Sequence, residues 1–241
     1  MEPELKNRLF PFHQVKGEES LVPQGRLLII GDVHGCVREL EKLLKTLNPQ
    51  KEDQILFLGD LINRGPDSKT VLSMARTLNA SSLLGNHEYR LLKHIHQPGS
   101  IILRSYEANL LDNLDSDDWN YLSSMVLWFE QPNEKRLFVH GGFLPKVPWH
   151  QQSAEIVTHI QTIDKQGIPR RRGEIPDAVF WTDLWDQEPF VIYGHTPRQK
   201  VVKTKTTIGI DTGCVWGGHL TALILPEFEI VQVKSKKNYI K

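Results

Sequence analysis

Apolar runs and helical patterns alternate along the first part of the chain. Residues 27–30 form a continuous apolar run, which is typical of a strand covered on both faces, and the run ends in the pair Gly31-Asp32. Residues 37–47 then carry apolar side chains at helical spacing, and an Asn-Pro pair ends this pattern. We therefore predict a strand followed directly by a helix.

The same order of strand, Gly plus polar residue, and helix occurs twice more. Predicted strands at 55–58 and 83–84 run into Gly59-Asp60 and Gly85-Asn86, and helical patterns follow each of them. Strands that alternate with helices predict a parallel core with right-handed crossovers.

The rest of the chain is less regular. We predict mainly helix over 105–130, a strand at 136–139 ending in His140, and several short strands after residue 190 that form a second, more antiparallel sheet. Residues 1–24 are polar, contain three prolines and show no sustained period, so they predict an extended arm. Residues 25–241 are expected to form one domain.

Composition excludes several classes of protein. With 39% hydrophobic and 24% charged residues the chain is ordinary for a globular protein, and no apolar run approaches the roughly 20 residues that cross a bilayer. The formal net charge is zero, which disfavours membrane surfaces and long nucleic acids as partners. The N-terminus lacks a secretory pattern, so we expect a cytoplasmic protein in which Cys36 and Cys214 are reduced.

Side chains of metal-ligand type follow the predicted strands. A single Gly-Asp pair after a strand usually forms a turn, and a lone histidine usually has a structural role. Here, however, the pattern repeats at several strand ends, which is where open α/β sheets bind their ligands. The six positions are Asp32, His34, Asp60, Asn86, His140 and His195. Carboxylate, amide and imidazole ligands without a thiolate suit manganese, which we expect, or iron, zinc, cobalt or nickel.

Two metal ions would give this set a hydrolytic chemistry. An aspartate can bridge two cations, which together clamp substrate oxygens and lower the pKa of a shared water, so that hydroxide forms near neutral pH and attacks phosphorus in line. Arg64 offers a planar fork that matches a phosphate group. His87 is placed to protonate the departing oxygen.

Five motifs together resemble the calcineurin-like metallophosphoesterases of the phosphoprotein phosphatase family. The motifs are Gly-Asp-Val-His-Gly at 31–35, Gly-Asp at 59–60 with Arg-Gly-Pro-Asp-Ser at 64–68, Gly-Asn-His-Glu at 85–88, His-Gly-Gly at 140–142 and Gly-His-Thr at 194–196. The resemblance implies an α/β fold, a four-layer αββα sandwich with two mixed β-sheets. It also implies one metal held by Asp32, His34 and Asp60, and a second held by Asp60, Asn86, His140 and His195. Arg64 matches the phosphate-binding arginine and His87 the general acid, and Asn86 is expected to contact substrate as well.

Asn63 departs from the pattern of the protein phosphatases, which usually carry aspartate there. Asparagine can hydrogen-bond to the imidazole of His87 but adds no negative charge, so His87 should be harder to protonate. This favours a phosphoanhydride with a good leaving group. Segments 85–92 and 211–218 resemble the symmetrical diadenosine tetraphosphatases, so we expect symmetrical hydrolysis of dinucleoside polyphosphates, such as diadenosine tetraphosphate, to nucleoside diphosphates.

Two alternatives stay open. A serine/threonine protein phosphatase or broad phosphomonoesterase is the first, because the interval from His140 to His195 is shorter than in the long bacterial tetraphosphatases; its substrate would be a phosphoprotein or small phosphate ester. A catalytically inactive binding module is the second.

Some residues cannot be placed from the sequence. One of the three arginines at 170–172, Arg170, Arg171 or Arg172, is expected to reach phosphate. Five aromatic residues either stack on a base or fill the core: Tyr106, Trp149, Trp181, Trp185 and Trp216. The oligomeric state is left open.

Overall fold

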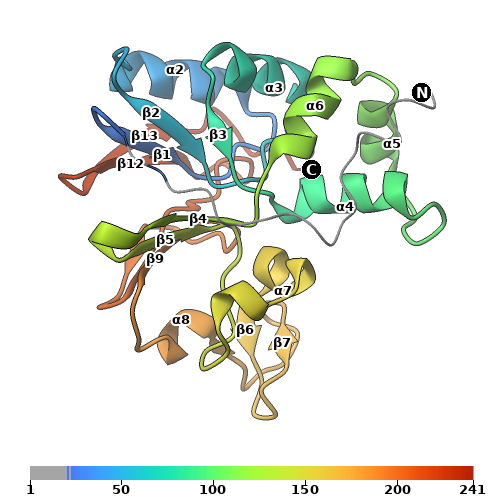
Figure 1. Ribbon diagram of the computed structural model, residues 1–241. Helices are drawn as coiled ribbons and strands as arrows, with labels where there is room; N and C mark the ends of the chain where they lie inside the picture. Colours follow the sequence, from blue (N-terminus) through green and yellow to red (C-terminus); the bar gives the residue numbers. More distant parts are fainter. Residues whose placement is uncertain (1–20, 22, 241) are drawn as a thin grey trace.

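The computed structural model describes Leu21 and residues 23–240. Two five-stranded sheets lie face to face (Figure 1). The first has the order β13 (Glu229–Lys234), β12 (His219–Leu225), β1 (Leu27–Ile30), β2 (Gln54–Phe57) and β3 (Ser81–Ser82). The second has the order β10 (Val202–Lys203), β11 (Thr207–Gly209), β9 (Phe190–Tyr193), β5 (Arg136–Val139) and β4 (Trp128–Gln131).

Helices cover the outer face of each sheet. Above the first sheet lie α2 (Val37–Leu47) and α3 (Ser68–Thr77), and beside it, past β3, lie α4 (Asn86–His96), α5 (Ser105–Leu111) and α6 (Ser116–Ser124). Below the second lie α7 (Ala154–His159), α8 (Trp181–Leu184) and a small sheet of β6 (Thr162–Ile163), β7 (Pro169–Arg170) and β8 (Val179–Phe180). Two short 3₁₀ helices, η1 (Pro132–Glu134) and η2 (Trp149–Gln151), complete the elements. The expected αββα sandwich with two mixed sheets is confirmed.

The continuous apolar run of β1 is explained by this layering. Successive side chains of a strand point to opposite faces, so a strand buried on both sides must be apolar at every position. Leu27 and Ile29 belong to the core between the sheets, whereas Leu28 and Ile30 pack under the helices. Leu21, the first described residue, is also buried between the sheets. The rest of the predicted arm at 1–24 lies almost wholly outside the described residues.

The sequence predictions were wrong where pairing overrides local pattern. The short strand expected at 83–84 is displaced to Ser81–Ser82, since those residues pair with β2, while Leu83 makes an isolated bridge to Val126. The segment 105–130 is mainly helical, as expected, through α5 and α6, and only its last residues, from Trp128, form β4, because they pair with β5.

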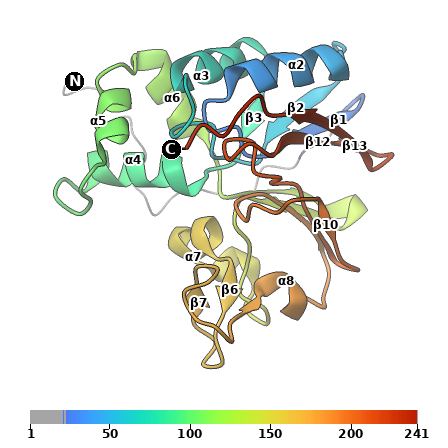
Figure 2. The same cartoon turned by 180° about the vertical axis from the view of Figure 1, so that it is seen from behind.

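The strands after residue 190 do not form one antiparallel sheet. β9 pairs in parallel with both β5 and β11, and only β10 and β4 at the two edges of this sheet are antiparallel. β12 and β13 return to the first sheet, where β12 lies antiparallel to β1 (Figure 2). The mixed pairing brings the carboxyl ends of β1, β2, β5 and β9 to one edge.

A partly buried ion pair before β1 gives a test of the stability of this framework. Asp53 accepts hydrogen bonds from the backbone N–H and the side chain of Arg26 and from Gln50 N–H, at 2.6–3.2 Å. The Arg26 side chain, opposed by burial, lowers the pKa of Asp53 to about 2. Asp53→Asn should therefore lower the free energy of unfolding by about 1–2 kcal/mol at pH 7, a value reduced because Arg26 is partly exposed.

Urea unfolding of both proteins measures this difference. Because the folded-state pKa lies below the ordinary value, the stabilisation is present at neutral pH and is lost as the pH falls toward 2. The difference between the two proteins should shrink over that range. Glu52→Gln, an exposed neighbour, serves as control, and an equal loss in both variants would contradict the prediction.

Candidate metal centre

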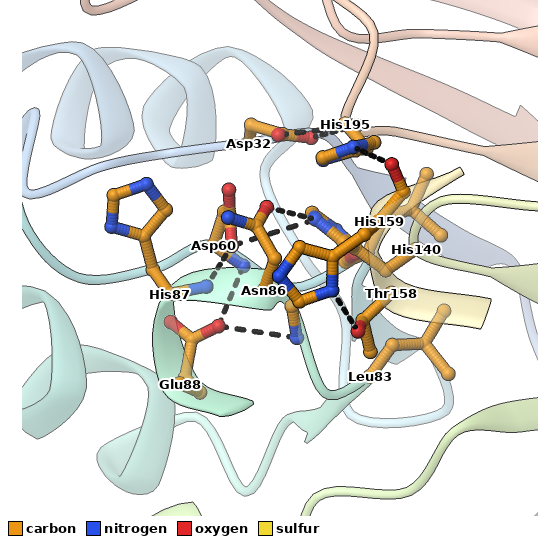
Figure 3. Close-up of polar contacts among 12 residues, drawn as sticks. Asp32, Asp60, Leu83, Asn86, His87, Glu88, His140, Thr158, His159 and His195 are labelled. Atoms are coloured by element: carbon orange, nitrogen blue, oxygen red, sulfur yellow. Dashed lines mark hydrogen bonds and ion pairs between the residues drawn. The ribbon is translucent and has the colours of Figure 1, made fainter. Parts of the chain in front are cut away.

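Strand ends from both sheets bring the predicted ligands into one cluster. Asp32 and His34 follow β1, Asp60 follows β2, and His140 and His195 follow β5 and β9. Asn86 begins α4, a short loop after β3. Figure 3 shows the side chains of Asp60, Asn86, His140 and His195 converging, with His87 on the other side of Asp60.

The backbone of this cluster is strained. His34, Asp60, Asn63, Arg64 and His195 are non-glycine residues with φ between 47° and 70°. This left-handed conformation costs roughly 1–2 kcal/mol for an ordinary residue and persists only where the surroundings hold it. Strain concentrated in one cluster of polar residues is typical of a functional site.

Two glycines allow the close approach of these loops. A Cβ on Gly85 would lie 2.3 Å from Asp60 Oδ1, and a Cβ on Gly194 would lie 2.3 Å from Asp32 Oδ1. Either position therefore excludes any side chain as long as the aspartate keeps its place.

Backbone carbonyls orient the three histidines. His34 Nδ1 lies 3.1 Å from Ile62 O, and His140 Nδ1 lies 2.7 Å from Leu58 O. His195 Nε2 lies 3.0 Å from His159 O. Each of these nitrogens must donate its hydrogen to the carbonyl, so the opposite ring nitrogen keeps a lone pair. Histidines that bind metals are commonly held in this way.

The free lone pair of His140 faces another acceptor. Asn86 Oδ1 lies 3.2 Å from His140 Nε2, although both atoms are acceptors in the tautomer that Leu58 O requires. Arg64 Nη1 donates to His34 Nε2 at 3.1 Å. Acceptors that face one another call for a cation between them, which is what a metal ion supplies.

Asp60 lies between two groups of side chains that can act as metal ligands. Its Oδ2 lies 3.5 Å from His34 Nε2, and its Oδ1 lies 3.5 Å from His140 Nε2. Ligand atoms of His34, Asp60 and His87 lie within 4.8 Å of one another, and so do those of Asp60, His140 and His195. Asp60 belongs to both groups and offers one oxygen to each.

Asp32, predicted to hold the first metal with His34 and Asp60, also supports a neighbouring loop. Both of its oxygens accept the backbone N–H of His195, at 3.0 and 3.1 Å, so it holds the loop after β9 (Figure 3).

Burial without compensating charge dominates the electrostatics. Desolvation raises the pKa of Asp60 and of Asp211 to about 7, and it raises that of Asp32 well above its ordinary value, helped by Asp211 and Asp60. Arg64 offsets part of this effect on all three. Burial also lowers the pKa of His140 to about 3, so this ring is neutral. Neutral imidazoles beside carboxylates that lack positive charge fit divalent cations.

Asn63 and Arg64 flank the predicted general acid. Asn63 Nδ2 lies 3.0 Å from His87 Nδ1 and donates to it, so the proton of the neutral ring is on Nε2. Burial, followed by the charges of His34 and Arg64, lowers the pKa of His87 well below its usual value. The structure thus places a neutral imidazole beside Asn63, in accord with the missing carboxylate.

Glu88 is a residue whose role the sequence analysis missed. It is fully buried, and its two oxygens accept the backbone N–H groups of Asp60, Leu61, Ile62 and Gly85 at 2.8–3.2 Å. It thereby shapes the loop that carries Asp60. A signal existed in the sequence, since glutamate at the third position of a helix commonly caps the backbone before it.

Two further residues of the site were not predicted as such. Asp211 is buried and lines the hollow in front of the metal centre, and His159 lines it as well. Asp211 lay within a motif quoted for the resemblance, whereas no pattern singled out His159.

The three arginines at 170–172 separate in space. Arg171 lines the hollow, whose volume is about 490 Å³. Arg170 is paired with Asp164 at 2.8 Å and Glu174 at 3.3 Å. Arg172 donates to Pro197 O and lines a second, adjoining hollow. Arg171 is therefore the member of the trio placed toward the metal centre.

The candidate base-stacking residues separate as clearly. Trp181 and Trp185 are buried in the core, 1% and 2% exposed. Trp149 donates to Glu130, and among the described residues neither it nor Tyr106 lines the hollow. Trp216 does line it and is 47% exposed.

The two cysteines are free thiols, buried side by side. Ligand atoms of Cys36, Glu39 and Cys214 lie within 4.8 Å of one another, which spacing in the sequence did not suggest. Glu39 already accepts from Lys236 N–H and from the hydroxyl of Tyr239, so this group anchors the C-terminal segment to α2.

Comparison with known proteins places this fold and site. The sequence profile of the calcineurin-like phosphoesterase family matches residues 25–231. The chain belongs to this family. It is therefore a hydrolase of a family that uses divalent metals, and no helix in the described part of the chain is long and apolar enough to span a membrane.

Within this family, the chain is similar to proteins named as tetraphosphatases. A bis(5'-nucleosyl)-tetraphosphatase PrpE [asymmetrical] from Oceanobacillus iheyensis is 30% identical, covering 88% of this chain and 93% of the relative. A protein of the same name from Bacillus thuringiensis is 28% identical over 88% and 95%. A crystal structure of a candidate diadenosine tetraphosphatase is 31% identical over 91% of this chain and 98% of that one, with a TM-score of 0.79.

A yeast serine/threonine phosphatase similar to human PP5 shares the fold at 16% identity. It covers 97% of this chain and 88% of the yeast chain, with a TM-score of 0.59. The expected resemblance to the phosphoprotein phosphatases and the diadenosine tetraphosphatases is confirmed.

Proposed function

We propose that this protein hydrolyses dinucleoside polyphosphates, such as diadenosine tetraphosphate, with two divalent cations that share Asp60. The observation that carries the proposal is the placement of one Asp60 oxygen toward His34 and the other toward His140, at 3.5 Å each. When bound, such cations polarise the phosphoryl oxygens and lower the pKa of a water. Manganese is the expected metal, with iron, zinc, cobalt and nickel as alternatives.

The protein's own residues supply binding and orientation. Arg64 lies beside the metal centre and binds the phosphate under attack. Arg171, which follows β7, lines the same hollow. Asn86 holds metal and substrate at the start of α4. His87, oriented by Asn63, donates a hydrogen bond from Nε2 to the departing oxygen. A neutral donor suffices for a leaving nucleotide phosphate, whereas an alkoxide needs a stronger acid.

The sequence motifs and the names of the relatives favour different directions of cleavage. Segments 85–92 and 211–218 favoured symmetrical cleavage to nucleoside diphosphates. The relatives from Oceanobacillus and Bacillus bear the name of asymmetrical enzymes and align along nearly their whole length. We adopt asymmetrical cleavage, to a nucleoside triphosphate and a nucleoside monophosphate.

A substrate screen tests the proposal. The metal-free protein is supplied in turn with each of the expected metals and given diadenosine tetraphosphate, a phosphoserine peptide or p-nitrophenyl phosphate. We expect the highest kcat/KM for the dinucleotide, with ATP and AMP as products separated by chromatography. Faster phosphate release from the peptide would favour a protein phosphatase. Hydrolysis of none of the three with any metal would favour the binding module.

A further inference from the structure

The hollow in front of the metal centre adjoins a second one, and a single wall divides them. Pro197, Gly213 and Trp216 line both the catalytic hollow of about 490 Å³ and the second hollow of about 900 Å³. We propose that the substrate binds at this wall in one orientation only. One of its bases stacks on Trp216, and the three phosphates of the leaving group lie toward Arg104. This inference rests on the proposed function and explains why the α-phosphorus is attacked.

Trp216 has the features of a base-stacking residue. It is 47% exposed, although its backbone is fixed by a hydrogen bond to Gly213 O and a β-bridge to Asn238. An exposed ring on a fixed backbone offers a stacking face at low entropic cost. Base stacking on an aromatic side chain tolerates different bases, as a dinucleotide enzyme requires.

The position of Trp216 relative to Arg64 selects the phosphate that is attacked. The guanidinium carbon of Arg64 lies 5.7 Å from the centre of the Trp216 ring. A nucleoside is joined directly to its α-phosphate, whereas the β-phosphate is one anhydride unit further away. A base on Trp216 therefore brings the α-phosphate to Arg64, and the remaining phosphates continue into the rest of the catalytic hollow.

The part of the catalytic hollow that lies along α4 is basic. The catalytic hollow extends along α4 to Arg90, Lys93 and Arg104. Glu107 pairs with Arg90 at 2.9 Å and Glu155 with Lys93 at 3.2 Å.

Arg104 differs from these two cations. Within the described residues no carboxylate oxygen lies within 4 Å of its guanidinium, which donates to the hydroxyl of Tyr106. Arg104 lines the catalytic hollow together with His87, the donor to the departing oxygen. Arg104 is thus the available cation on the leaving-group side.

The reaction this arrangement supports is balanced by one water. The water oxygen forms a bond to the α-phosphorus, and the bond from that phosphorus to the bridging oxygen breaks. The bridging oxygen keeps the electron pair and becomes a terminal oxygen of the nucleoside triphosphate. The nucleoside monophosphate keeps the new oxygen, and the water protons pass to the products and solvent.

Hydrolysis in ¹⁸O-labelled water tests the direction. With diadenosine tetraphosphate and manganese, we expect ATP without label and AMP with one labelled oxygen, measured by mass spectrometry. Label in ATP would overturn this inference and leave the proposed function intact. ADP as the product would overturn both this inference and the asymmetrical direction, and would leave only hydrolysis of the dinucleotide. Absence of dinucleotide hydrolysis together with turnover of p-nitrophenyl phosphate would overturn the proposed function itself.

Two variants test the residues. Trp216→Ala should raise KM for the dinucleotide roughly 10-fold, and Trp216→Phe should recover much of this loss. Arg104→Gln should lower kcat/KM for the dinucleotide about 10-fold and affect p-nitrophenyl phosphate less, since nitrophenolate carries no phosphates.

Matched controls keep the test specific. Trp149→Phe and the exposed Arg38→Gln, neither of which lines the catalytic hollow, should change neither constant. Equal effects in test and control variants, or equal effects on both substrates, would overturn the inference.

Discussion

Asp60→Asn should lower kcat at least about 100-fold for every phosphate substrate and reduce the metal bound per chain. An amide has only one oxygen, so it cannot offer an oxygen to a cation beside His34 and to a second cation beside His140. Its NH₂ group would instead face the lone pair of one of these histidines. The measurements are turnover of p-nitrophenyl phosphate and metal content by mass spectrometry after dialysis.

The same variant separates a loss of chemistry from a loss of folding. Burial raises the pKa of Asp60 to about 7, so its carboxylate is a cost to the metal-free fold, and an amide removes that cost. We expect the metal-free variant to be at least as stable as the parent. Asp186→Asn, at an exposed site, is the matched control. Full activity and metal content in Asp60→Asn would refute the shared site.

Glu88→Gln should lower the free energy of unfolding by about 2–4 kcal/mol and activity by about 10–100-fold. One of its two buried oxygens would become an NH₂ group facing N–H donors, so up to two of the four hydrogen bonds are lost. The loop that presents Asp60 would then move. Urea unfolding and kcat at a fixed manganese concentration that is below saturation measure the two effects.

The control for this variant is Glu41→Gln on the exposed face of α2. Because Glu88 acts through Asp60, excess metal should restore part of the activity of Glu88→Gln and none of that of Asp60→Asn. Loss of stability without any change in metal affinity would mean that Glu88 supports only the fold.

Asn63 connects the site to the choice of substrate. Its amide donates to His87 where a carboxylate would add charge, and its own Oδ1 is buried without a partner among the described residues. A neutral His87 is adequate when the departing group is a nucleotide phosphate. The geometry therefore agrees with the argument from the sequence that favoured a phosphoanhydride, although the direction of cleavage had to come from elsewhere.

The sequence by itself determined the strands that carry the site and the identity of its donors. A strand buried on both faces is apolar, as β1 is at every position and β5 is after Arg136, and both were predicted with their observed bounds. The donors follow those strands within a few residues, so local order placed them at strand ends. Both signals are local, and neither depends on how distant segments meet.

Only the tertiary structure decided which donors face each other and which residues serve them. The histidine tautomers depend on carbonyls of Leu58, Ile62 and His159, which lie far from their partners in sequence. The separation of Arg171 from its neighbours and the exposure of Trp216 depend on how loops from the two sheets pack. These relations arise from long-range packing, because a side chain's surroundings are set by segments that its own neighbours in the chain do not specify.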